Sequence, residues 1–153
     1  MPRKSFRVGR SKTGLGLFAI TEIPKGRIIT EYRGRRISNK LAESREKHGA
    51  RYMFELNSKW TLDGSPRYNL ARYANHACRP NAEADIVRGK ILLRAIRRIR
   101  PDDEITYDYG KEYFDLFFRP SSCLCAHCGD KKRSSKKASS PRLRGKKKPK
   151  RGR

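Results

Sequence analysis

No apolar run in this chain of 153 residues is longer than four or five residues, and glycine, proline and aspartate separate the runs. Short apolar segments bounded by turn residues are typical of β-strands, and none is long enough to cross a membrane as a helix. We therefore expect a mainly β body with little helix. The expected strands cover residues 6–8, 15–20, 27–32, 52–56, 60–62, 85–87, 90–96 and 104–109.

Two segments are predicted to be helical. The clearer one runs from about residue 39 to residue 48, because Ser38 is a favourable N-cap and Gly49 lies just past the end. A shorter helix is expected at residues 69–73. Arg88 and Gly89 together have the length of a two-residue hairpin turn between two of the expected strands.

Charge is distributed unevenly along the chain. Of the formal net charge of +24, residues 131–153 carry +13, with no acidic residue, and residues 1–130 carry the other +11. The basic segment cannot bury enough apolar surface to offset its ordering entropy, so we expect it to be disordered. Its charge favours a polyanionic partner, above all nucleic acid. A membrane partner is not expected, because the segment has no apolar face to insert.

The N-terminal ten residues are basic and lack the apolar stretch of a secretory signal. We therefore expect an intracellular protein of a reducing compartment, whose four cysteines are thiols or metal ligands rather than disulfides. The location would be the nucleus in a eukaryote, and the cytoplasm or nucleoid in a bacterium.

Three segments carry residue types suited to binding or catalysis. Residues 12–18 read Lys-Thr-Gly-Leu-Gly-Leu-Phe, residues 72–81 read Arg-Tyr-Ala-Asn-His-Ala-Cys-Arg-Pro-Asn, and residues 102–110 read Asp-Asp-Glu-Ile-Thr-Tyr-Asp-Tyr-Gly. Taken alone, each has an ordinary structural explanation: a turn into a strand, a capped turn, and aromatic residues on the buried face of a strand. The first is not a dinucleotide-binding fingerprint, because no third glycine follows and no helix begins there.

Taken together, in this order, the three segments resemble the SET-domain protein lysine methyltransferases. Residues 75–81 differ from the family's Asn-His-Ser-Cys-x-Pro-Asn motif by Ala77 in place of serine, and residues 104–109 match its Glu-x-x-(Phe/Tyr)-Asp-Tyr motif. Residues 14–18 match the family's glycine strand, and Pro-Lys-Gly at residues 24–26 and Glu-Tyr-x-Gly at residues 31–34 follow at a similar distance. The resemblance spans roughly residues 3–129.

The resemblance implies a mainly β SET-domain fold of short β-sheets with a C-terminal pseudoknot and few short helices. It divides the chain into a SET domain at residues 1–118, a post-SET zinc-binding segment at 119–130 and the disordered tail at 131–153. The body is a minimal version of the fold, without a cysteine-rich segment before the domain. In this it is similar to small viral and bacterial members of the family.

The activity implied by the resemblance is S-adenosylmethionine-dependent N-methylation of a protein lysine. The lysine must first lose its proton, and a narrow apolar channel beside a sulfonium charge lowers the pKa of its amine. The implied catalytic residues are Tyr109, Tyr107 and Tyr32, with Tyr52 as a further channel wall. The implied cofactor-binding residues are Gly14, Leu15, Gly16, Leu17, Arg72, Asn75, His76 and Tyr109. In the family, tyrosine at the position of Tyr107 is typical of enzymes that stop early, which predicts mainly monomethylation.

Three of the four cysteines, Cys123, Cys125 and Cys128, lie within six residues of one another. Thiols this close are poorly placed to form disulfides with one another, and in a reducing compartment they suit Zn(II). The resemblance implies that Cys78 supplies the fourth ligand of a structural zinc site. The last gap is two residues instead of the family's usual four, so His127 is an alternative ligand, and four unliganded thiols are the other alternative.

The expected partner is a histone, a nucleoid protein or another basic DNA-associated protein that presents a target lysine, with nucleic acid bound by the tail. A body charge of +11 repels a lysine-rich peptide at long range. The repulsion is avoided if the substrate is already on DNA, lies beside acidic residues, or is this chain's own tail. The alternative function is that of a catalytically inactive SET-like DNA-binding or architectural protein.

Overall fold

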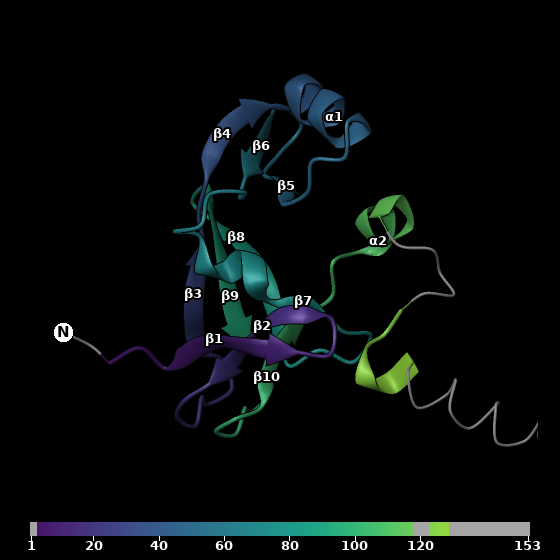
Figure 1. The fold of residues 1–153 in the computed structure, drawn as a ribbon. Helices are drawn as coiled ribbons and strands as arrows, with labels where there is room; N and C mark the ends of the chain where they lie inside the picture. The colour runs from purple at the N-terminus through teal and green to yellow at the C-terminus, as the bar shows by residue number, and fades with distance from the viewer. Residues whose placement is uncertain (1–2, 118–122, 129–153) are drawn as a thin grey trace, which may run out of the picture.

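The computed structural model describes residues 3–117 and 123–128, and three small sheets form the body (Figure 1). The first sheet contains, in spatial order, β1 (Phe6–Ser11), β2 (Gly14–Ala19), β10 (Glu104–Tyr107) and β7 (Asn75–His76). The second contains β3 (Ile28–Tyr32), β9 (Lys90–Ala95) and β8 (Ala82–Val87). The third contains β4 (Arg35–Ser38), β6 (Trp60–Asp63) and β5 (Met53–Glu55). The helical elements are α1 (Asn39–Lys47), the 3₁₀ turn η1 (Leu70–Tyr73) and α2 (Lys111–Phe117).

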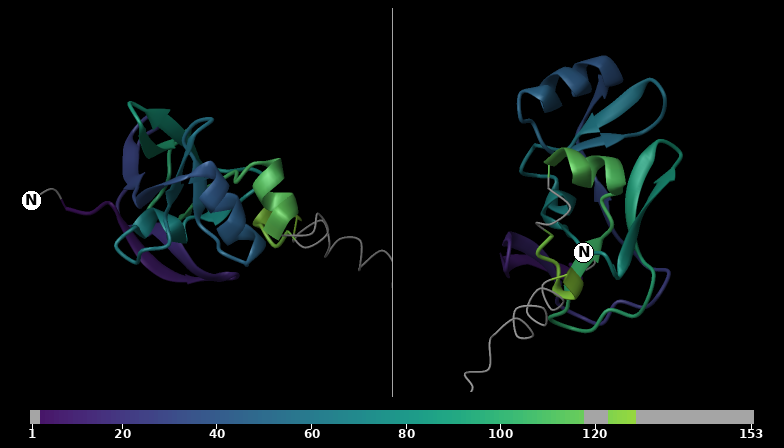
Figure 2. Two further views of the ribbon diagram at one scale, coloured as in Figure 1. Left: turned by 90° about the horizontal axis from the view of Figure 1, so that it is seen from above. Right: turned by 90° about the vertical axis from the view of Figure 1, so that its right-hand side faces the viewer.

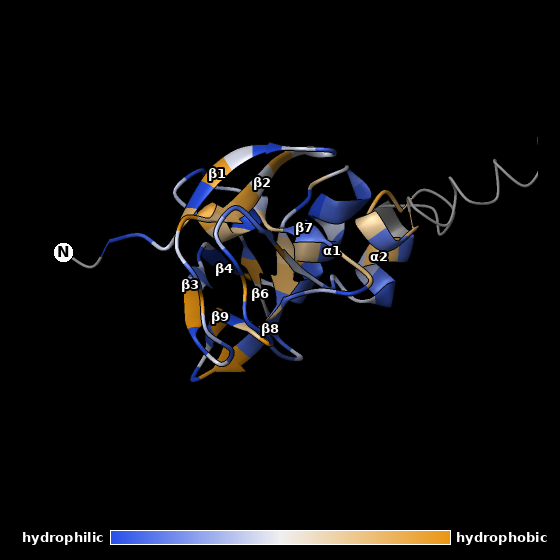
Figure 3. Ribbon diagram, turned by 90° about the horizontal axis from the view of Figure 1, so that it is seen from below, coloured by the Kyte–Doolittle hydropathy of each residue, from blue (hydrophilic) through white to orange (hydrophobic). Residues whose placement is uncertain are grey.

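Alternating apolar side chains on the strands form the core. Ile91, Leu93 and Ala95 point inward from β9, and Ile105 and Tyr107 do so from β10, because successive side chains of a strand lie on opposite faces. The largest fully buried side chains are Leu17, Ile23, Asn69, Ile91, Leu93, Ile99 and Ile105. In Figure 3 the apolar residues are concentrated on strands such as β3, while the loops between strands are mostly hydrophilic. The prediction of a mainly β fold is thus confirmed.

Helix α1 begins and ends close to where the sequence predicts. The Ser38 hydroxyl accepts a hydrogen bond from the Leu41 N–H at 3.2 Å, which satisfies one of the unpaired donors of the first turn. Gly49 follows the helix with a φ of +86°, a left-handed conformation that glycine adopts without strain. The helix packs against the third sheet.

The hairpin between β8 and β9 also agrees with its sequence. Arg88 and Gly89 both have positive φ angles, of 49° and 75°, between the paired residues Val87 and Lys90. Two consecutive positive φ angles give the turn whose twist matches that of the flanking strands.

Three elements were not predicted, and one differs in kind. Strand β4 begins with two arginines and contains no buried residue. Strand β7 is only two residues long, and helix α2 begins directly after a glycine. Neither of the two strands has the apolar period that identifies an element in sequence, and α2 is only seven residues long. The expected helix at residues 69–73 is the single 3₁₀ turn η1, and the expected strand at residues 104–109 ends at Tyr107.

The pairing of β7 with β10 positions the motif segments. The two strands run parallel, with Asn75 opposite Thr106 and His76 opposite Tyr107, so segments about thirty residues apart in sequence lie side by side. Figures 1 and 2 show α1, α2 and the segment 123–128 following one another along one side of the molecule, with α1 at the end that holds the third sheet. The pseudoknot stays a prediction, and the tail at residues 131–153 lies outside the described residues.

Candidate active site

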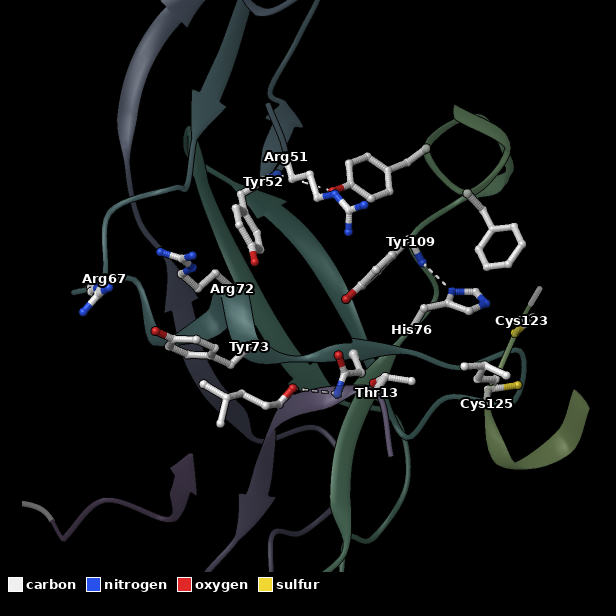
Figure 4. Close-up of a pocket in the computed structure, with 15 residues that line it drawn as sticks. Thr13, Arg51, Tyr52, Arg67, Arg72, Tyr73, His76, Tyr109, Cys123 and Cys125 are labelled. Atoms are coloured by element: carbon white, nitrogen blue, oxygen red, sulfur yellow. Dashed lines mark hydrogen bonds between the residues drawn. The ribbon is translucent and has the colours of Figure 1, made fainter. Parts of the chain in front are cut away.

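A cavity of about 750 Å³ opens beside the β7–β10 pair (Figure 4). All three motif segments contribute to its wall, together with the loop at residues 51–52, helix α2 and the cysteine segment. The lining residues are Thr13, Leu15, Arg51, Tyr52, Arg67, Arg72, Tyr73, Asn75, His76, Tyr109, Tyr113, Phe114, Cys123, Leu124 and Cys125. A cavity of this size, with apolar and aromatic walls and a few polar groups, is suited to a cofactor-sized ligand.

Asn75 and Glu104 connect the strands that form the floor of this cavity. The Asn75 side-chain amide donates to the carbonyl of Leu15 at 2.9 Å and to Glu104 Oε1 at 2.8 Å. Glu104 Oε2 accepts from the Ser11 hydroxyl at 3.0 Å. One carboxylate thereby links β1, β7 and β10. A Cβ atom at Gly16 would collide with that carboxylate, so a larger residue there would displace Glu104 from these hydrogen bonds.

His76 connects the cavity wall to the cysteines. Its Nδ1 accepts a hydrogen bond from the backbone N–H of Tyr109 at 3.2 Å, which requires an unprotonated Nδ1. Burial lowers the pKa of His76, although the carboxylate of Asp108 at 3.6 Å acts in the opposite direction. A neutral ring carries its proton on Nε2, which lies 3.5 Å from the Sγ of Cys78.

Tyr109 lies at the centre of a cluster of aromatic rings. Its ring packs against Tyr107 at a centroid distance of 4.9 Å, against Tyr113 edge-on at 5.4 Å and against His76 at 5.4 Å. Its hydroxyl donates to the carbonyl of Ala74 at 2.7 Å. Burial raises the pKa of Tyr109 well above that of an exposed phenol, so the hydroxyl stays protonated near neutral pH.

A second cavity, of about 700 Å³, is also lined by Tyr107, Tyr109 and Tyr113 of this cluster. It includes Tyr32 and Tyr107 in its wall, together with residues of α1, β5 and α2. The side chains that line both cavities are Tyr52, Arg72, Tyr109 and Tyr113. These four side chains therefore form the boundary where the two cavities approach each other, and Figure 4 shows the hydroxyls of Tyr52 and Tyr109 pointing into the same space.

Tyr52 is held in an unusual conformation at this boundary. Its φ of 68° is left-handed, which is rare for a bulky residue. Its carbonyl accepts from the Tyr32 hydroxyl and from the Gly64 N–H, each at 2.8 Å, and its N–H donates to the Tyr113 hydroxyl at 3.3 Å. A Cβ atom at Gly64 would collide with the Tyr32 ring. These contacts together hold the Tyr52 backbone in its strained conformation, as is common at functional sites.

The four cysteines come together beside the first cavity. Their Sγ atoms all lie within 4.8 Å of one another, with Cys78 at 3.8 Å from Cys123 and at 3.6 Å from Cys128. Burial and hydrogen bonding among the sulfurs raise the pKa of the Cys78 thiol. The described residues hold no other such group of His, Cys, Asp or Glu ligands, and His127 is not part of this one.

The residues predicted to bind the cofactor are divided in the structure. Leu15, Arg72, Asn75, His76 and Tyr109 line the first cavity. The other three, Gly14, Gly16 and Leu17, lie in β2 and do not line it. Because the Leu17 side chain is fully buried in the core, any ligand contact at this position is through the backbone.

Residues 14–110 match the family model of the SET domain. The chain belongs to the SET-domain family. Histone-lysine N-methyltransferase 2D of Homo sapiens is 35% identical over 125 residues, which are 76% of this chain and 2% of that protein. The H3 lysine-4 specific histone-lysine N-methyltransferase of Saccharomyces cerevisiae is 35% identical over 120 residues, 72% of this chain and 11% of that protein. This SET-domain chain therefore spans only a small part of the length of these relatives.

A similar solved structure supports the same fold. A humanized mutant of the Chaetomium thermophilum Polycomb Repressive Complex 2 bound to an inhibitor aligns with a TM-score of 0.63 at 31% identity, covering 70% of this chain and 15% of that one. None of the helices in the described part of the SET-domain chain is long and apolar enough to cross a membrane.

Three aromatic residues of the cavity wall were not predicted as site residues, namely Tyr73 on η1 and two on α2. Tyr113 and Phe114 lie on α2, and Phe114 packs against the His76 ring at a centroid distance of 4.8 Å. The available signal was this aromatic pair, which begins four residues after the end of the motif at residues 104–109. It was not recognised because α2 itself was not predicted.

The Asn75 amide is expected to stabilise the fold as well as shape the cavity. Replacing it in Asn75→Ala leaves the Leu15 carbonyl and the Glu104 carboxylate without this donor, so the free energy of unfolding should fall by about 1–3 kcal/mol. Urea denaturation followed by the fluorescence of Trp60 measures the change. The exposed control Glu83→Ala should stay within about 0.5 kcal/mol of the wild type. An unchanged midpoint for Asn75→Ala would contradict the role of the amide.

Proposed function

We propose that this chain transfers a methyl group from S-adenosylmethionine to a lysine side chain of a protein. The observation that carries the proposal is the pair of cavities that share Tyr52, Arg72, Tyr109 and Tyr113. Two reactants bound on opposite sides would meet only across this boundary, and their alignment supplies much of the rate. The relatives named above are histone-lysine methyltransferases, which favours a protein lysine over a small-molecule substrate.

The first cavity fits the cofactor in size and in its polar groups. Among the described residues, the Nε atom of Arg72 is buried without a hydrogen-bond partner, so it is suited to an acceptor such as a carboxylate. The Arg72 guanidinium lies 4.3 Å from the centre of the Tyr52 ring, which fixes its plane. When bound, the sulfonium group supplies an electrophilic methyl group. Leu15, Asn75, His76 and Tyr109 would complete the binding wall, as the sequence predicts.

The tyrosines would act by orienting the substrate amine rather than by taking its proton. Burial raises the pKa of Tyr32, Tyr107 and Tyr109, so none of them is a phenolate near neutral pH. The Tyr109 hydroxyl proton points to the Ala74 carbonyl, and so the oxygen meets an amine as a hydrogen-bond acceptor. This polarity directs the nitrogen lone pair away from Tyr109 and complements the positive charge of the transferring methyl group.

The expected substrate is a histone or another basic DNA-associated protein. The relatives named above are eukaryotic histone methyltransferases, which favours a nuclear setting and lends no support to a bacterial one. The competing possibility, an inactive SET-like architectural protein, conflicts with the intact set of Tyr109, Asn75 and His76 around the cavity.

Methyl transfer is tested with labelled S-adenosylmethionine and a mixture of core histones, linker histone and nucleoid proteins. Tyr109→Phe should lower the rate by about a hundredfold or more, because the phenol that orients the amine is lost. Tyr68→Phe is the matched control, since Tyr68 is 63% exposed and lines neither cavity. Equal labelling by all three proteins would exclude the proposed role of Tyr109. Labelling that is absent from the wild type, with cofactor binding intact, would favour the architectural alternative.

Tyr107 is proposed to limit the number of methyl groups. Its side chain is buried at the wall of the second cavity, where the hydroxyl fills space that a methylated amine would need to rotate. Mass spectrometry of the product should show mainly monomethyl-lysine with the wild type and a shift to dimethyl- and trimethyl-lysine with Tyr107→Phe. An unchanged product distribution in the variant would exclude this role.

We also propose that the four cysteines bind one structural zinc ion. A tetrahedral site with Zn–S bonds of about 2.3 Å places its sulfurs about 3.8 Å apart, and the Cys78–Cys123 and Cys78–Cys128 separations of 3.8 and 3.6 Å fit this value. Such a site would hold the segment 123–128 against β7 and so complete the wall of the first cavity.

Metal analysis of the purified protein should find one zinc ion per chain, and chelation should lower the melting temperature. Cys125→Ser should lose the metal. His127→Ala should retain it, because the histidine is outside the sulfur cluster. Zinc loss in His127→Ala would instead assign that residue as a ligand.

A further inference from the structure

The turn between β8 and β9 holds an arginine in a backbone conformation that arginine adopts only under strain. Arg88 is the first central residue of this two-residue turn, and its φ of 49° lies in the left-handed region that asparagine, aspartate and glycine prefer. Its side chain forms no salt bridge or hydrogen bond with any described residue that would offset this strain. A strained residue whose side chain has no structural role points to a function for that side chain.

The turn lies at the exposed tip of the β8–β9 hairpin. All five residues from 86 to 90 are exposed, whereas Ile91 and Leu93 of β9 are buried. Figure 2 shows the hairpin extending outward from the body. None of these five exposed residues lines either cavity, so the tip is separate from the candidate active site.

Three further cations lie close to Arg88. The Nη2 atom of Arg36, on β4, lies 3.7 Å from the point that a Cβ atom of Gly89 would occupy, so this guanidinium lies beside the turn. The Nζ atom of Lys90 and the Nε atom of Arg33 lie 3.8 and 3.7 Å from the same carboxylate oxygen of Glu31. We name these four side chains the basic tip: Arg33, Arg36, Arg88 and Lys90.

The basic tip has an excess of positive charge that faces solvent. Its salt-bridge partner among the described residues is Glu31, and one carboxylate cannot neutralise four cations. Asp85, the acidic residue of β8 that lies nearest to the turn in sequence, is already paired with Arg94 at 2.8 Å. The side chains of Arg33 and Lys90 stay 64% and 65% exposed beside Glu31, so their charge is available to a polyanion.

We propose that the basic tip binds duplex DNA, with Arg88 entering a groove and the other three cations contacting the phosphates beside it. The major groove is about 12 Å wide and admits a two-stranded β-ribbon, so an exposed hairpin fits it in shape as well as in charge. The inference goes beyond methyl transfer and does not depend on it. It also differs from the DNA binding expected of residues 131–153, because the basic tip belongs to the folded body.

The uncharged neighbours of the basic tip favour a duplex over the other polyanions. Proteins that bind single strands combine cations with aromatic side chains on which bases stack. The exposed residues that precede Arg88 are instead the aliphatic Ile86 and Val87, which suit contacts with thymine methyl groups or base steps in a groove. Two β-branched side chains are also a small apolar surface with which to enter a membrane. Because the basic tip lines neither cavity, DNA bound there leaves both cavities open.

The test measures the binding of the full chain to a labelled duplex of mixed sequence by fluorescence anisotropy, over a series of salt concentrations. In R33Q/R36Q/R88Q/K90Q the plot of log Kobs against log salt should become shallower by about 3 to 4, because each phosphate contact contributes about 0.9 to its slope. The dissociation constant at physiological ionic strength should rise by about tenfold or more. Residues 131–153 are intact in both proteins, so the difference reports the basic tip alone.

The matched control removes the same amount of charge from other parts of the surface. K12Q/K25Q/K47Q/K59Q replaces four lysines that are exposed and form no salt bridge with a described residue. Its slope should stay within about 1 of the wild-type slope. A loss in the first variant that exceeds the loss in this control therefore assigns binding to the basic tip rather than to net charge.

A single substitution separates loss of binding from loss of folding. Asn-Gly is a preferred pair for a hairpin turn of this kind, so Arg88→Asn relieves the strain of the turn while it removes the cation at its tip. The melting temperature should rise by about 1–4 °C, whereas the salt slope of duplex binding should become shallower by about 1. A misfolded protein cannot produce these two changes together.

Two results would overturn the inference. One is a salt slope for duplex binding that changes no more in R33Q/R36Q/R88Q/K90Q than in the lysine control. The other is a loss of binding by this variant to single-stranded DNA, or to vesicles of phosphatidylserine and phosphatidylcholine, while its duplex binding equals that of the lysine control. Both are measured without S-adenosylmethionine, so neither result depends on whether the chain transfers a methyl group.

Discussion

The parallel pairing of β7 with β10 is the constraint on which the rest of the site depends. It sets Asn75 opposite Thr106 and His76 opposite Tyr107, and the Asn75–Glu104 hydrogen bond extends the connection to β1 and β2. Parallel neighbours cannot be joined by a tight turn, and the long connection between them forms β8 and β9 of the second sheet. The same arrangement brings Tyr109 to the end of β10, where its side chain separates the two cavities.

Much of this site could be predicted because its chemistry depends on a few residue types at fixed spacing. Tyr109, Asn75 and His76 line the first cavity, and the four cysteines converge, as the motifs indicate. The missing parts depend on tertiary contacts instead. Strand β7 exists only through its pairing with β10, and β4 is a polar strand held by its register with β6, from Arg35 opposite Asp63 to Ser38 opposite Trp60. Neither has a local apolar period that sequence reasoning can detect. The grouping of the basic residues around the β8–β9 turn likewise requires β4 and β9 to be placed in space.

The placement of charge in the molecule carries information that its total charge does not. The excess of lysine and arginine gives the molecule its net charge of +24, while Arg33, Arg36, Arg88 and Lys90 are gathered around the β8–β9 turn. Net charge determines long-range association with polyanions, whereas the position of individual charges determines what is recognised at contact. Composition alone therefore describes the attraction between the molecule and its surroundings better than it describes where a partner binds.

Cys123 and Cys125 are shared by two sites, because they lie in the sulfur cluster and also line the first cavity. His76 strengthens the connection, with one ring nitrogen accepting from the Tyr109 backbone and the other facing Cys78. Under the proposed function, binding in the cavity and binding at the sulfurs would therefore be coupled equilibria. Thermodynamic reciprocity then requires the two effects to be equal. If the metal raises the affinity for the cavity ligand by some factor, the ligand raises the affinity for the metal by the same factor. If the proposed zinc ion and methyl donor occupy these two sites, a shortage of zinc would lower the affinity for the methyl donor.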